Sequence, residues 1–450
     1  MEIEKLFSDI SSYVWGFPLI ILLIGGGLYL IIYSRFIPFK YFFHAIDIVR
    51  GKYDNSNDEG EISHFAALST ALSATVGMGN IAGVSVAISI GGPGAIFWMW
   101  VSGIIGMSTK FFTSSLAIMF RGKDSAGNIQ GGPMYFITEG LGKKWKALAV
   151  FFSICGLIGA LPVFNVNQLK QAINDILLIP MGYEVGLQSN LLIGLLLIII
   201  TSIVILGGLK RISAVASKLV PFMVLVYMIS VIAIIIINIE ELPYYIKLIF
   251  YDAFTALNYR GDSVTGGVLG SLIVLGIRRG AFSNEAGIGM APMAHGAAKT
   301  NSPIREGLVA MLGPAIDTLF VCTLTALAIL ITGVWETDLN GVTLTAAAFN
   351  KSLPLIGRYL LLICVIVFSV SSLFTYSYYG TKCLSYLLGE KNKKYYNYIY
   401  IISIMLGATT SLSLMINLID TFFALMAIPT MLATIILAPK VVEALKNYKI

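Results

Sequence analysis

The sequence has little charge: Asp, Glu, Lys and Arg make up only 12% of its 450 residues. In soluble globular proteins about 25% of the residues are charged, and these residues form much of the surface that faces water. A chain with half that share lacks the residues for such a surface. The scarcity of charge therefore argues against a soluble enzyme, a disordered chain and a protein that binds nucleic acid.

Residues that bind metals or form disulfide bonds are also few. The four cysteines are scattered through apolar runs without a CxxC motif, and the three histidines do not have the spacing of metal ligands. We expect the cysteines to be small core residues. The sequence contains no HExxH, GxSxG or P-loop motif, which argues against a hydrolase and an ATP-driven pump. We therefore predict that the protein is not an enzyme and carries no cofactor.

Long hydrophobic runs are abundant. Hydrophobic residues make up 57% of the chain, and its mean hydropathy is +0.84. The hydrocarbon core of a bilayer needs about 20 consecutive apolar residues of helix. Eleven runs reach that length, at 13–34, 64–91, 95–120, 146–178, 189–209, 212–238, 264–293, 305–333, 355–388, 396–413 and 416–438. We predict an all-α polytopic membrane protein with about 11 transmembrane helices.

The positions of lysine and arginine predict the orientation of these helices. If the N-terminus lies outside, most basic residues fall in the loops that this scheme puts inside. Basic loops stay on the cytoplasmic side of a membrane. We therefore expect a multi-pass protein of the cell (plasma) membrane with the N-terminus outside and the C-terminus in the cytoplasm.

Two of the runs contain residues that interrupt a helix. Residues 73–83 combine three glycines with Thr75 and Asn80, and residues 276–289 combine four glycines with two arginines and Glu285. Glycine weakens a helix interior by about 1 kcal/mol relative to alanine. Close helix packing through small residues is the alternative explanation. The polar residues in both segments favour paired broken helices, which mark the binding site of secondary transporters.

The spans form two sets of five, at 64–238 and 264–438. Because five is odd, the second set starts on the opposite side of the membrane, which predicts an inverted repeat with one extra N-terminal helix. The predicted parts are 1–60, the extra helix and a cytoplasmic loop; 61–240, the first five-helix repeat; 241–440, the second five-helix repeat; and 441–450, a cytoplasmic tail.

A broken helix exposes groups of both polarities. Free N–H groups at a half-helix N-terminus suit a carboxylate, and free C=O groups suit a cation or an ammonium group. The amides of Gly77, Met78 and Gly79 are approachable because two of the three residues lack a side chain. Ser283 and Asn284 lie in the second interrupted segment. This combination predicts a small amino acid as substrate, together with a cation.

Hydroxyl groups in the ninth run offer ligands for that cation. Ser371 and Ser372 follow Phe368 by three and four residues and share one helical face with it. Neutral oxygen atoms of this kind suit Na⁺. The alternative is that both hydroxyls bond to carbonyl groups of their own helix.

Ionisable side chains at membrane depth are expected to be functional. Arg278, Arg279, Glu285 and Asp317 belong to this group. We expect Arg279 to pair with Asp317 or Glu285 as a gating or structural bridge. The alternative is that a carboxylate binds the ion or the substrate ammonium group. Lys110 lies nearer a helix end and is expected to extend to the interface.

Amide side chains interrupt the fourth run. Asn165 and Gln168 are three residues apart and share a helical face. Because an amide that faces lipid is costly, we expect them to contact the substrate or to bond between helices.

Several motifs resemble one known family, the alanine/glycine:cation symporters. The longest is GGPGAIFWMWVSGIIG at 91–106, and shorter ones stand at 131–136, 282–287, Ala294 with His295, and 378–380. The resemblance extends over about residues 60–390. It implies a sodium- or proton-coupled importer of alanine and glycine with the leucine-transporter-like five-plus-five inverted repeat.

The resemblance also implies roles for single residues. Residues 76–80 are similar to the unwound segment of the leucine transporter. It implies that the Thr75 carbonyl and the Gly77 and Gly79 amides contact the substrate, and that Asn80 lies at a first ion position. The implied second sodium site comprises the carbonyls of Ser73, Val76 and Phe368 and the hydroxyls of Ser371 and Ser372.

The predicted function is sodium-coupled symport of alanine or glycine into the cell by alternating access, with Na⁺ as coupling ion and membrane lipid as surroundings. Two alternatives stay open. One is proton coupling through Glu285 or Asp317. The other is an amino-acid-gated channel or sensor.

Overall fold

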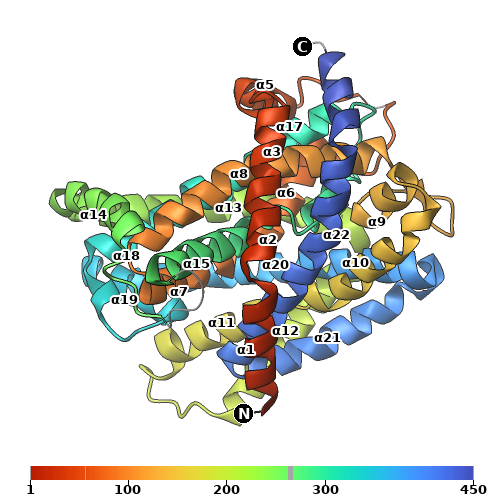
Figure 1. Ribbon diagram of the computed structural model, residues 1–450. Helices are drawn as coiled ribbons and strands as arrows, with labels where there is room; N and C mark the ends of the chain where they lie inside the picture. The colour runs from red at the N-terminus through yellow and green to blue at the C-terminus, as the bar shows by residue number, and fades with distance from the viewer. Residues whose placement is uncertain (1, 56, 262–266, 449–450) are drawn as a thin grey trace.

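The computed structural model describes residues 2–55, 57–261 and 267–448 and is built almost wholly of helices (Figure 1). The first half contains α1 (Glu2–Val14), α2 (Phe17–Ile20), η1 (Ile21–Gly25), α3 (Gly26–Tyr33), α4 (Ile37–Lys40), α5 (Phe42–Val49), α6 (His64–Thr75), η2 (Gly79–Gly83), α7 (Val84–Gly91), α8 (Gly94–Met119), α9 (Pro133–Tyr135), η3 (Phe136–Gly140), η4 (Lys143–Trp145), α10 (Lys146–Gly159), α11 (Val163–Ile173), η5 (Asn174–Leu178), α12 (Leu187–Ile205) and α13 (Gly208–Ile237).

The second half contains η6 (Ile239–Glu241), α14 (Leu242–Thr255), α15 (Gly267–Asn284), α16 (Ala291–His295), α17 (Pro303–Pro314), η7 (Ala315–Cys322), α18 (Thr323–Ile331), η8 (Val334–Glu336), α19 (Gly341–Ser352), α20 (Gly357–Leu388), η9 (Glu390–Asn392), α21 (Lys394–Thr409) and α22 (Leu412–Lys446). The strands β1 (Gly122–Lys123) and β2 (Ile129–Gln130) form a small antiparallel hairpin.

Among the described residues, seven helices are long and apolar enough to cross a membrane: Gly94–Met119, Lys143–Leu178, Leu187–Ile205, Gly208–Ile237, Pro303–Ile331, Gly357–Leu388 and Leu412–Lys446. Two bent pairs, Glu4–Val14 with Phe17–Tyr33 and His64–Thr75 with Gly79–Gly91, raise the number to nine if each is one span. The other two predicted runs correspond to the shorter helices α15 with α16, and α21. Residues 264–266 of the predicted seventh run lie outside the described part of the chain.

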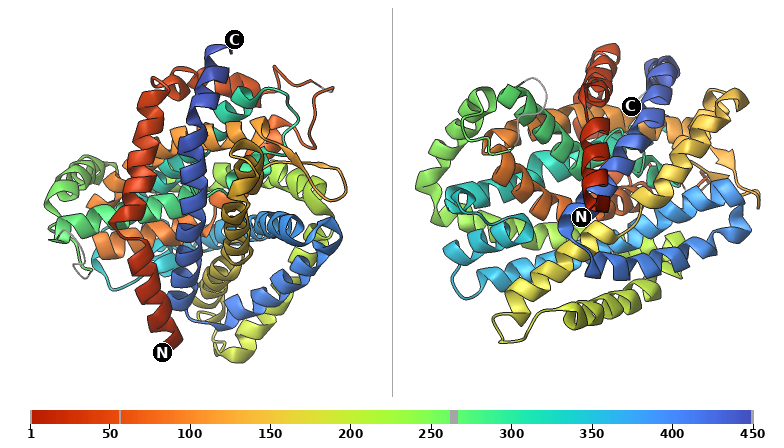
Figure 2. Two further views of the ribbon diagram at one scale, coloured as in Figure 1. Left: turned by 45° about the vertical axis from the view of Figure 1, so that its right-hand side comes forward. Right: turned by 60° about the horizontal axis from the view of Figure 1, so that its bottom comes forward.

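The ends of the chain differ from the prediction. The first helix starts at Glu2 rather than at 13, and it bends by 50° between Val14 and Phe17. The last helix continues to Lys446, beyond the predicted end at 438. The hydropathy pattern did not reveal the first turns of α1, because this part of the helix is amphipathic and its charged residues keep the local hydropathy low. In Figures 1 and 2 the N-terminal helices and α22 lie side by side.

The central helices form two groups. In one, α8 packs against α15, α16 and α17, and α16 also contacts α6. In the other, α20 packs against α10, α11 and α13. Helix α6 contacts both groups, because it packs against α13 and α20 as well. The first broken helix therefore lies at the boundary between the two groups.

Both interrupted segments do depart from helical geometry. The first break is at 76–78, where Val76 has φ −75° and ψ 88°. The second begins at Glu285, whose φ is +55°, and ends where α16 starts at Ala291. The second break is shorter than predicted, because residues 276–284 continue α15.

Gly276 and Gly280 are packing residues rather than parts of the break. A Cβ atom on Gly276 would lie 2.7 Å from the carbonyl oxygen of Ala95, and one on Gly280 would lie 3.2 Å from the Cα of Met99. These two glycines allow α15 to pack closely on α8. At these positions, the alternative explanation of close helix packing is correct.

Backbone pairing joins the segments next to α6 and α16. Ile62 and Ala298 form a parallel bridge, and the amide of Lys299 donates to the carbonyl of Ile62 at 2.6 Å. Arg121 at the end of α8 donates hydrogen bonds to the carbonyl oxygens of Gly296, Ala298, Thr300 and Glu59. The carboxylate of buried Glu306 bonds to His64 and His295.

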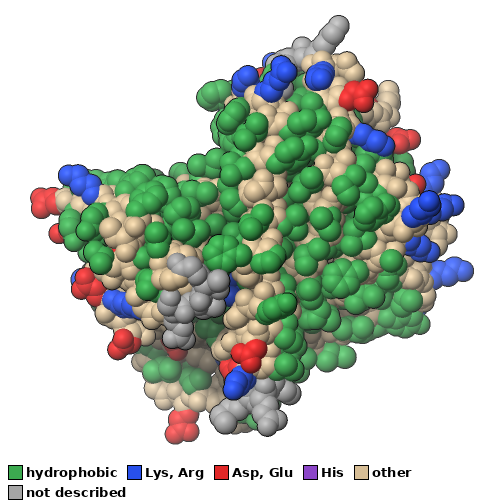
Figure 3. All heavy atoms as spheres, in the orientation of Figure 1, with side chains coloured by type: hydrophobic (Ala, Val, Ile, Leu, Met, Phe, Trp, Pro, Cys, Tyr) green, Lys and Arg blue, Asp and Glu red, His purple; other side chains and the backbone are tan. Residues whose placement is uncertain are grey.

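The surface is largely apolar. On the face drawn in Figure 3, hydrophobic side chains cover most of the area, and charged side chains lie mainly around its edges. Large exposed apolar residues are frequent on α12 and α13, for example Leu192, Ile203 and Phe222. Such a surface is suited to lipid rather than to water.

Candidate substrate and ion site

The first break is held open by its own side chains. Asn80 Oδ1 accepts a hydrogen bond of 2.9 Å from the amide of Gly77, and the amide of Asn80 donates to the Gly77 carbonyl at 3.2 Å. Asn80 thus supplies hydrogen-bond partners for the backbone of Gly77, where the break interrupts the helical hydrogen bonds. One consequence is that the Gly77 amide, a predicted substrate contact, already has a partner.

Oxygen atoms gather where α6 meets α20. Ser73 Oγ donates to the carbonyl of Ser371 at 2.7 Å, and Thr375 Oγ1 donates to Ser73 Oγ at 3.1 Å. Ser371 and Ser372 both donate to the Phe368 carbonyl, at 2.9 and 3.0 Å. The structure therefore brings Ser73, Phe368, Ser371 and Ser372 of the predicted sodium site together, with the break at Val76 beside them.

Gly77 permits this contact. A Cβ atom at Gly77 would lie 2.5 Å from the hydroxyl of Ser372 and 3.8 Å from the Phe368 carbonyl. A side chain here would displace the Ser372 hydroxyl from its present position. The close approach of α20 to the first break therefore explains why residue 77 is a glycine.

Asp317 connects the two broken helices. Asn80 Nδ2 donates to Asp317 Oδ1 at 2.7 Å, and Ser283 Oγ donates to Asp317 Oδ2 at 2.9 Å. Asp317 is fully buried in the π-helical segment η7, and a Cβ at Gly79 would lie 3.4 Å from the Cα of Ser283. A carboxylate with several neutral oxygen atoms around it is a suitable environment for a cation.

A small cavity of about 20 Å³ lies beside these breaks. Thr75 and Gly79 line it from the first break, and Asn165 lines it from α11. Aromatic residues close much of the rest: Phe164, Phe282, Tyr376 and Phe423. The volume is close to that needed for one water molecule, so the cavity is nearly closed in this structure.

The other predicted substrate contacts lie away from the cavity lining. Gln168 donates to Gln171 at 3.0 Å and accepts from the amide of Val342 at 3.3 Å, so it bonds between helices, as its alternative reading states. Asn284 donates to Thr318 at 3.0 Å. Met78 is buried. Ser283 reaches Asp317 rather than the cavity.

Arg279 does not pair with Asp317 or Glu285. Its Nη2 donates to Asp420 Oδ2 on α22 at 2.6 Å, and Arg278 Nε donates to the same oxygen at 2.9 Å. Arg278 also donates to Ser11, and Trp15 donates to the Asp420 carbonyl. Sequence reasoning missed Asp420, although a lone carboxylate inside the run 416–438 was a usable signal.

Lys110 does not extend to the interface. It is only 1% exposed, and a Cβ at Gly313 of α17 would lie 3.3 Å from its Nζ. The glycine leaves space for the lysine between α8 and α17. Glu285, in the second break, accepts a hydrogen bond of 2.5 Å from the hydroxyl of Tyr376 on α20.

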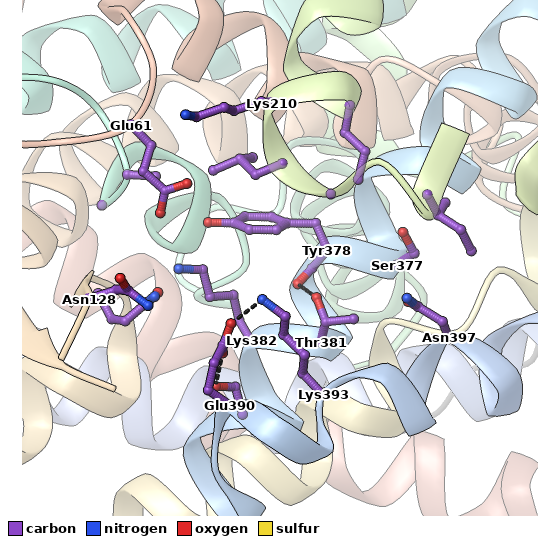
Figure 4. A pocket seen from close by; sticks show the side chains of 18 of the residues that line it. Glu61, Asn128, Lys210, Ser377, Tyr378, Thr381, Lys382, Glu390, Lys393 and Asn397 are labelled. Atoms are coloured by element: carbon purple, nitrogen blue, oxygen red, sulfur yellow. Dashed lines mark hydrogen bonds and ion pairs between the residues drawn. The ribbon is translucent and has the colours of Figure 1, made fainter. Parts of the chain in front are cut away.

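A larger cavity of about 720 Å³ opens at another part of α20 (Figure 4). We call it the vestibule. Its lining includes Glu61, Gln130, Tyr378, Lys382 and Glu390, and thus residues next to the hairpin and to the paired segments before α6 and after α16. Figure 4 shows Glu61, Tyr378 and Lys382 directed into this space. The vestibule is much wider than the cavity beside the breaks. Charged side chains, among them Lys382 and Glu390, line the vestibule, whereas aromatic rings line much of the small cavity.

Sequence comparisons agree with this architecture. The sequence model of the sodium:alanine symporter family matches residues 1–450. The sodium/alanine symporter AgcS of Methanococcus maripaludis is 39% identical, with 100% of this chain and 98% of AgcS covered. The amino-acid carrier protein AlsT of Bacillus subtilis is 31% identical, with 97% of this chain and 90% of AlsT covered.

A solved structure shares the fold. MhsT in complex with L-phenylalanine matches with a TM-score of 0.62 at 15% sequence identity, with 84% of this chain and 89% of MhsT covered. The chain thus has the leucine-transporter-like fold, as predicted, and is a multi-pass membrane protein.

Proposed function

Because the chain belongs to the sodium:alanine symporter family, we propose that it is a secondary transporter that uses an inward sodium gradient to bring alanine or glycine into the cell. The observation that carries this proposal is the meeting of two broken helices at one small cavity. Half-helix ends supply N–H and C=O groups to a zwitterion, and neutral oxygen atoms for a cation lie next to them.

The substrate is assigned to the cavity beside Thr75, Gly79 and Asn165. Its volume of about 20 Å³ is small, so the smallest amino acids require the least movement of the surrounding rings. Phe164 and Phe282 meet edge to face, with 5.1 Å between ring centroids, and leave little space for a long side chain. This packing supports alanine or glycine over larger substrates.

Two ion positions are assigned. The first comprises Asn80, Ser283 and Asp317, where a carboxylate joins both broken helices. The second comprises the carbonyls of Ser73, Val76 and Phe368 and the hydroxyls of Ser371 and Ser372. At the second position Na⁺ would bind α6 to α20 and replace the hydrogen bonds that the hydroxyls now make to Phe368.

The mechanism is alternating access. With the vestibule open and the aromatic cavity nearly closed, the structure corresponds to the state that faces the vestibule. We assign this side to the cytoplasm, because the basic residues Lys210, Lys382 and Lys393 line it and basic segments stay inside. The C-terminus is then cytoplasmic and the N-terminus is outside. Arg279 and Asp420 hold α15 to α22.

Proton coupling is the second candidate, and it is favoured by the burial of Glu285 and Asp317. Uptake of labelled alanine and glycine into proteoliposomes tests both candidates. We expect uptake that follows an inward sodium gradient and ceases when potassium replaces sodium. Uptake that persists without sodium and follows an imposed pH gradient would support proton coupling instead. Sodium should also tighten alanine binding in calorimetry, since coupling between two ligands is reciprocal.

A further inference from the structure

Tyr376 lies on the part of α20 that contributes to both cavities. Its side chain lines the small cavity together with Thr75 and Gly79. The next residues of α20, Ser377 and Tyr378, line the vestibule. Tyr376 therefore lies where α20 passes from the small cavity to the vestibule.

One hydrogen bond holds this part of α20. The hydroxyl of Tyr376 donates to Glu285 Oε1 at 2.5 Å, and Glu285 lies in the second break with a φ of +55°. Both side chains are buried. The bond therefore joins α20 to the irregular segment between α15 and α16, two parts that belong to different helix groups. A positive φ at a residue other than glycine is strained and is maintained by its surroundings.

Glu285 lacks a second partner. No other described residue bonds to its Oε2 atom, although this atom is buried. Lys110 of α8 is a buried cation within electrostatic range of this carboxylate. The geometry agrees, since Gly106, one turn before Lys110, faces the second break: a Cβ there would lie 2.8 Å from the Cβ of Ala286.

We propose that the hydrogen bond between Tyr376 and Glu285 is the gate between the substrate cavity and the vestibule, with Glu285 and Lys110 as the residues that position Tyr376. This proposal rests on the proposed function, because it treats the small cavity as the substrate site. Release of the substrate requires the phenol ring to leave Glu285. The ring can do so when the second break moves relative to α20.

The test measures access to the small cavity through the vestibule. Leu161, which lines the small cavity, is replaced by cysteine in a chain whose four native cysteines are replaced by alanine or serine. A membrane-impermeant thiol reagent is added to inside-out vesicles in the absence of sodium and alanine. Right-side-out vesicles show how much labelling comes from the other side.

Tyr376→Phe keeps the ring and removes the hydrogen bond. We therefore expect labelling at least about tenfold faster in inside-out vesicles, which corresponds to about 1.4 kcal/mol. Tyr379→Phe is the matched control, because Tyr379 is buried on the same helix and its hydroxyl has no partner among the described residues. Equal labelling rates in Tyr376→Phe and the parent chain would overturn the proposal.

The role of Lys110 has its own test. We expect Lys110→Met to speed labelling, and we expect it to have less than about a twofold further effect when Glu285→Gln is already present. Fully additive effects would remove Lys110 from the gate. A melting temperature for each variant in detergent separates altered access from loss of fold.

The labelling experiment involves no substrate, so it tests the proposed gate independently of the uptake measurement. If the wild-type chain failed to take up alanine, the proposed function would fail, whereas the labelling rates would still report access to the small cavity at Tyr376.

Discussion

Arg279 and Asp420 form a buried ion pair, with 2.6 Å between guanidinium Nη2 and carboxylate Oδ2. The pair joins α15, which leads into the second break, to α22. Arg278 bonds to the same carboxylate oxygen, so that two guanidinium groups share one carboxylate. Within the described residues, Oδ1 of Asp420 has no partner. The arrangement holds α15 to α22.

Asp420→Asn should destabilise the protein. Removal of one partner from a buried pair costs about 3–5 kcal/mol, because it leaves the other charge without compensation. We expect a clearly lower melting temperature in detergent. Asp338→Asn, at an exposed position, is the control and should leave the melting temperature unchanged. An equal melting temperature in both variants would show that the pair adds nothing to stability.

Ser372→Ala should weaken sodium binding. Loss of one oxygen ligand that contributes about 1.4 kcal/mol corresponds to about a tenfold lower affinity. The measurement is the sodium dependence of alanine uptake. Ser369→Ala is the matched control, because the Ser369 hydroxyl is buried on the same helix and has no hydrogen-bond partner in the described part of the chain. An unchanged sodium affinity in Ser372→Ala would exclude its hydroxyl from the site.

Gly77→Ala should disturb the contact between α6 and α20. The new Cβ would lie 2.5 Å from the Ser372 hydroxyl, and overpacking of this kind costs about 1–3 kcal/mol. We expect reduced stability and reduced uptake. Gly83→Ala, for which the structure has free space within 4 Å, serves as control. Combination with Ser372→Gly should restore stability; no restoration would place the strain elsewhere.

The loop between β1 and β2 should loosen in acid. Burial alone would raise the pKa of Asp124, but hydrogen bonds from Asn128, Gln130 and the Ala126 amide lower this pKa below its ordinary value. The stabilisation is therefore present above the ordinary pKa and is lost as the pH falls through the lowered one. The protection of residues 122–130 against hydrogen exchange, taken relative to the intrinsic rate at each pH, should fall below about pH 4. In Asp124→Asn this protection should be low at every pH, and a pH profile of protection like that of the wild type would contradict this assignment.

Local chemistry explains what the sequence could predict. Gly77, Gly79 and Asn80 stand within four residues, so composition alone places the first break. The hydroxyls of Ser371 and Ser372 are likewise neighbours on one helix, and their helical face follows from their spacing. The motifs that resemble the symporter family predicted the fold, which MhsT shares.

Contacts between distant segments explain what the sequence could not predict. Arg279 and Asp420 are 141 residues apart, and nothing near either residue indicates the other. Lys110 is buried because Gly313 of α17 leaves it space. Gly276 and Gly280 have the composition of a break, but they serve close packing on α8, and only the position of that helix distinguishes the two roles.

The paired backbone of residues 59–62 and 297–300 limits how the molecule can open. The two half-helices α6 and α16 cannot separate at this end unless main-chain hydrogen bonds and the contacts of Arg121 break. An outward swing of α6 by itself would be costly. Widening of the vestibule therefore has to tilt α6, α16, α17 and the end of α8 together, as a single rigid body.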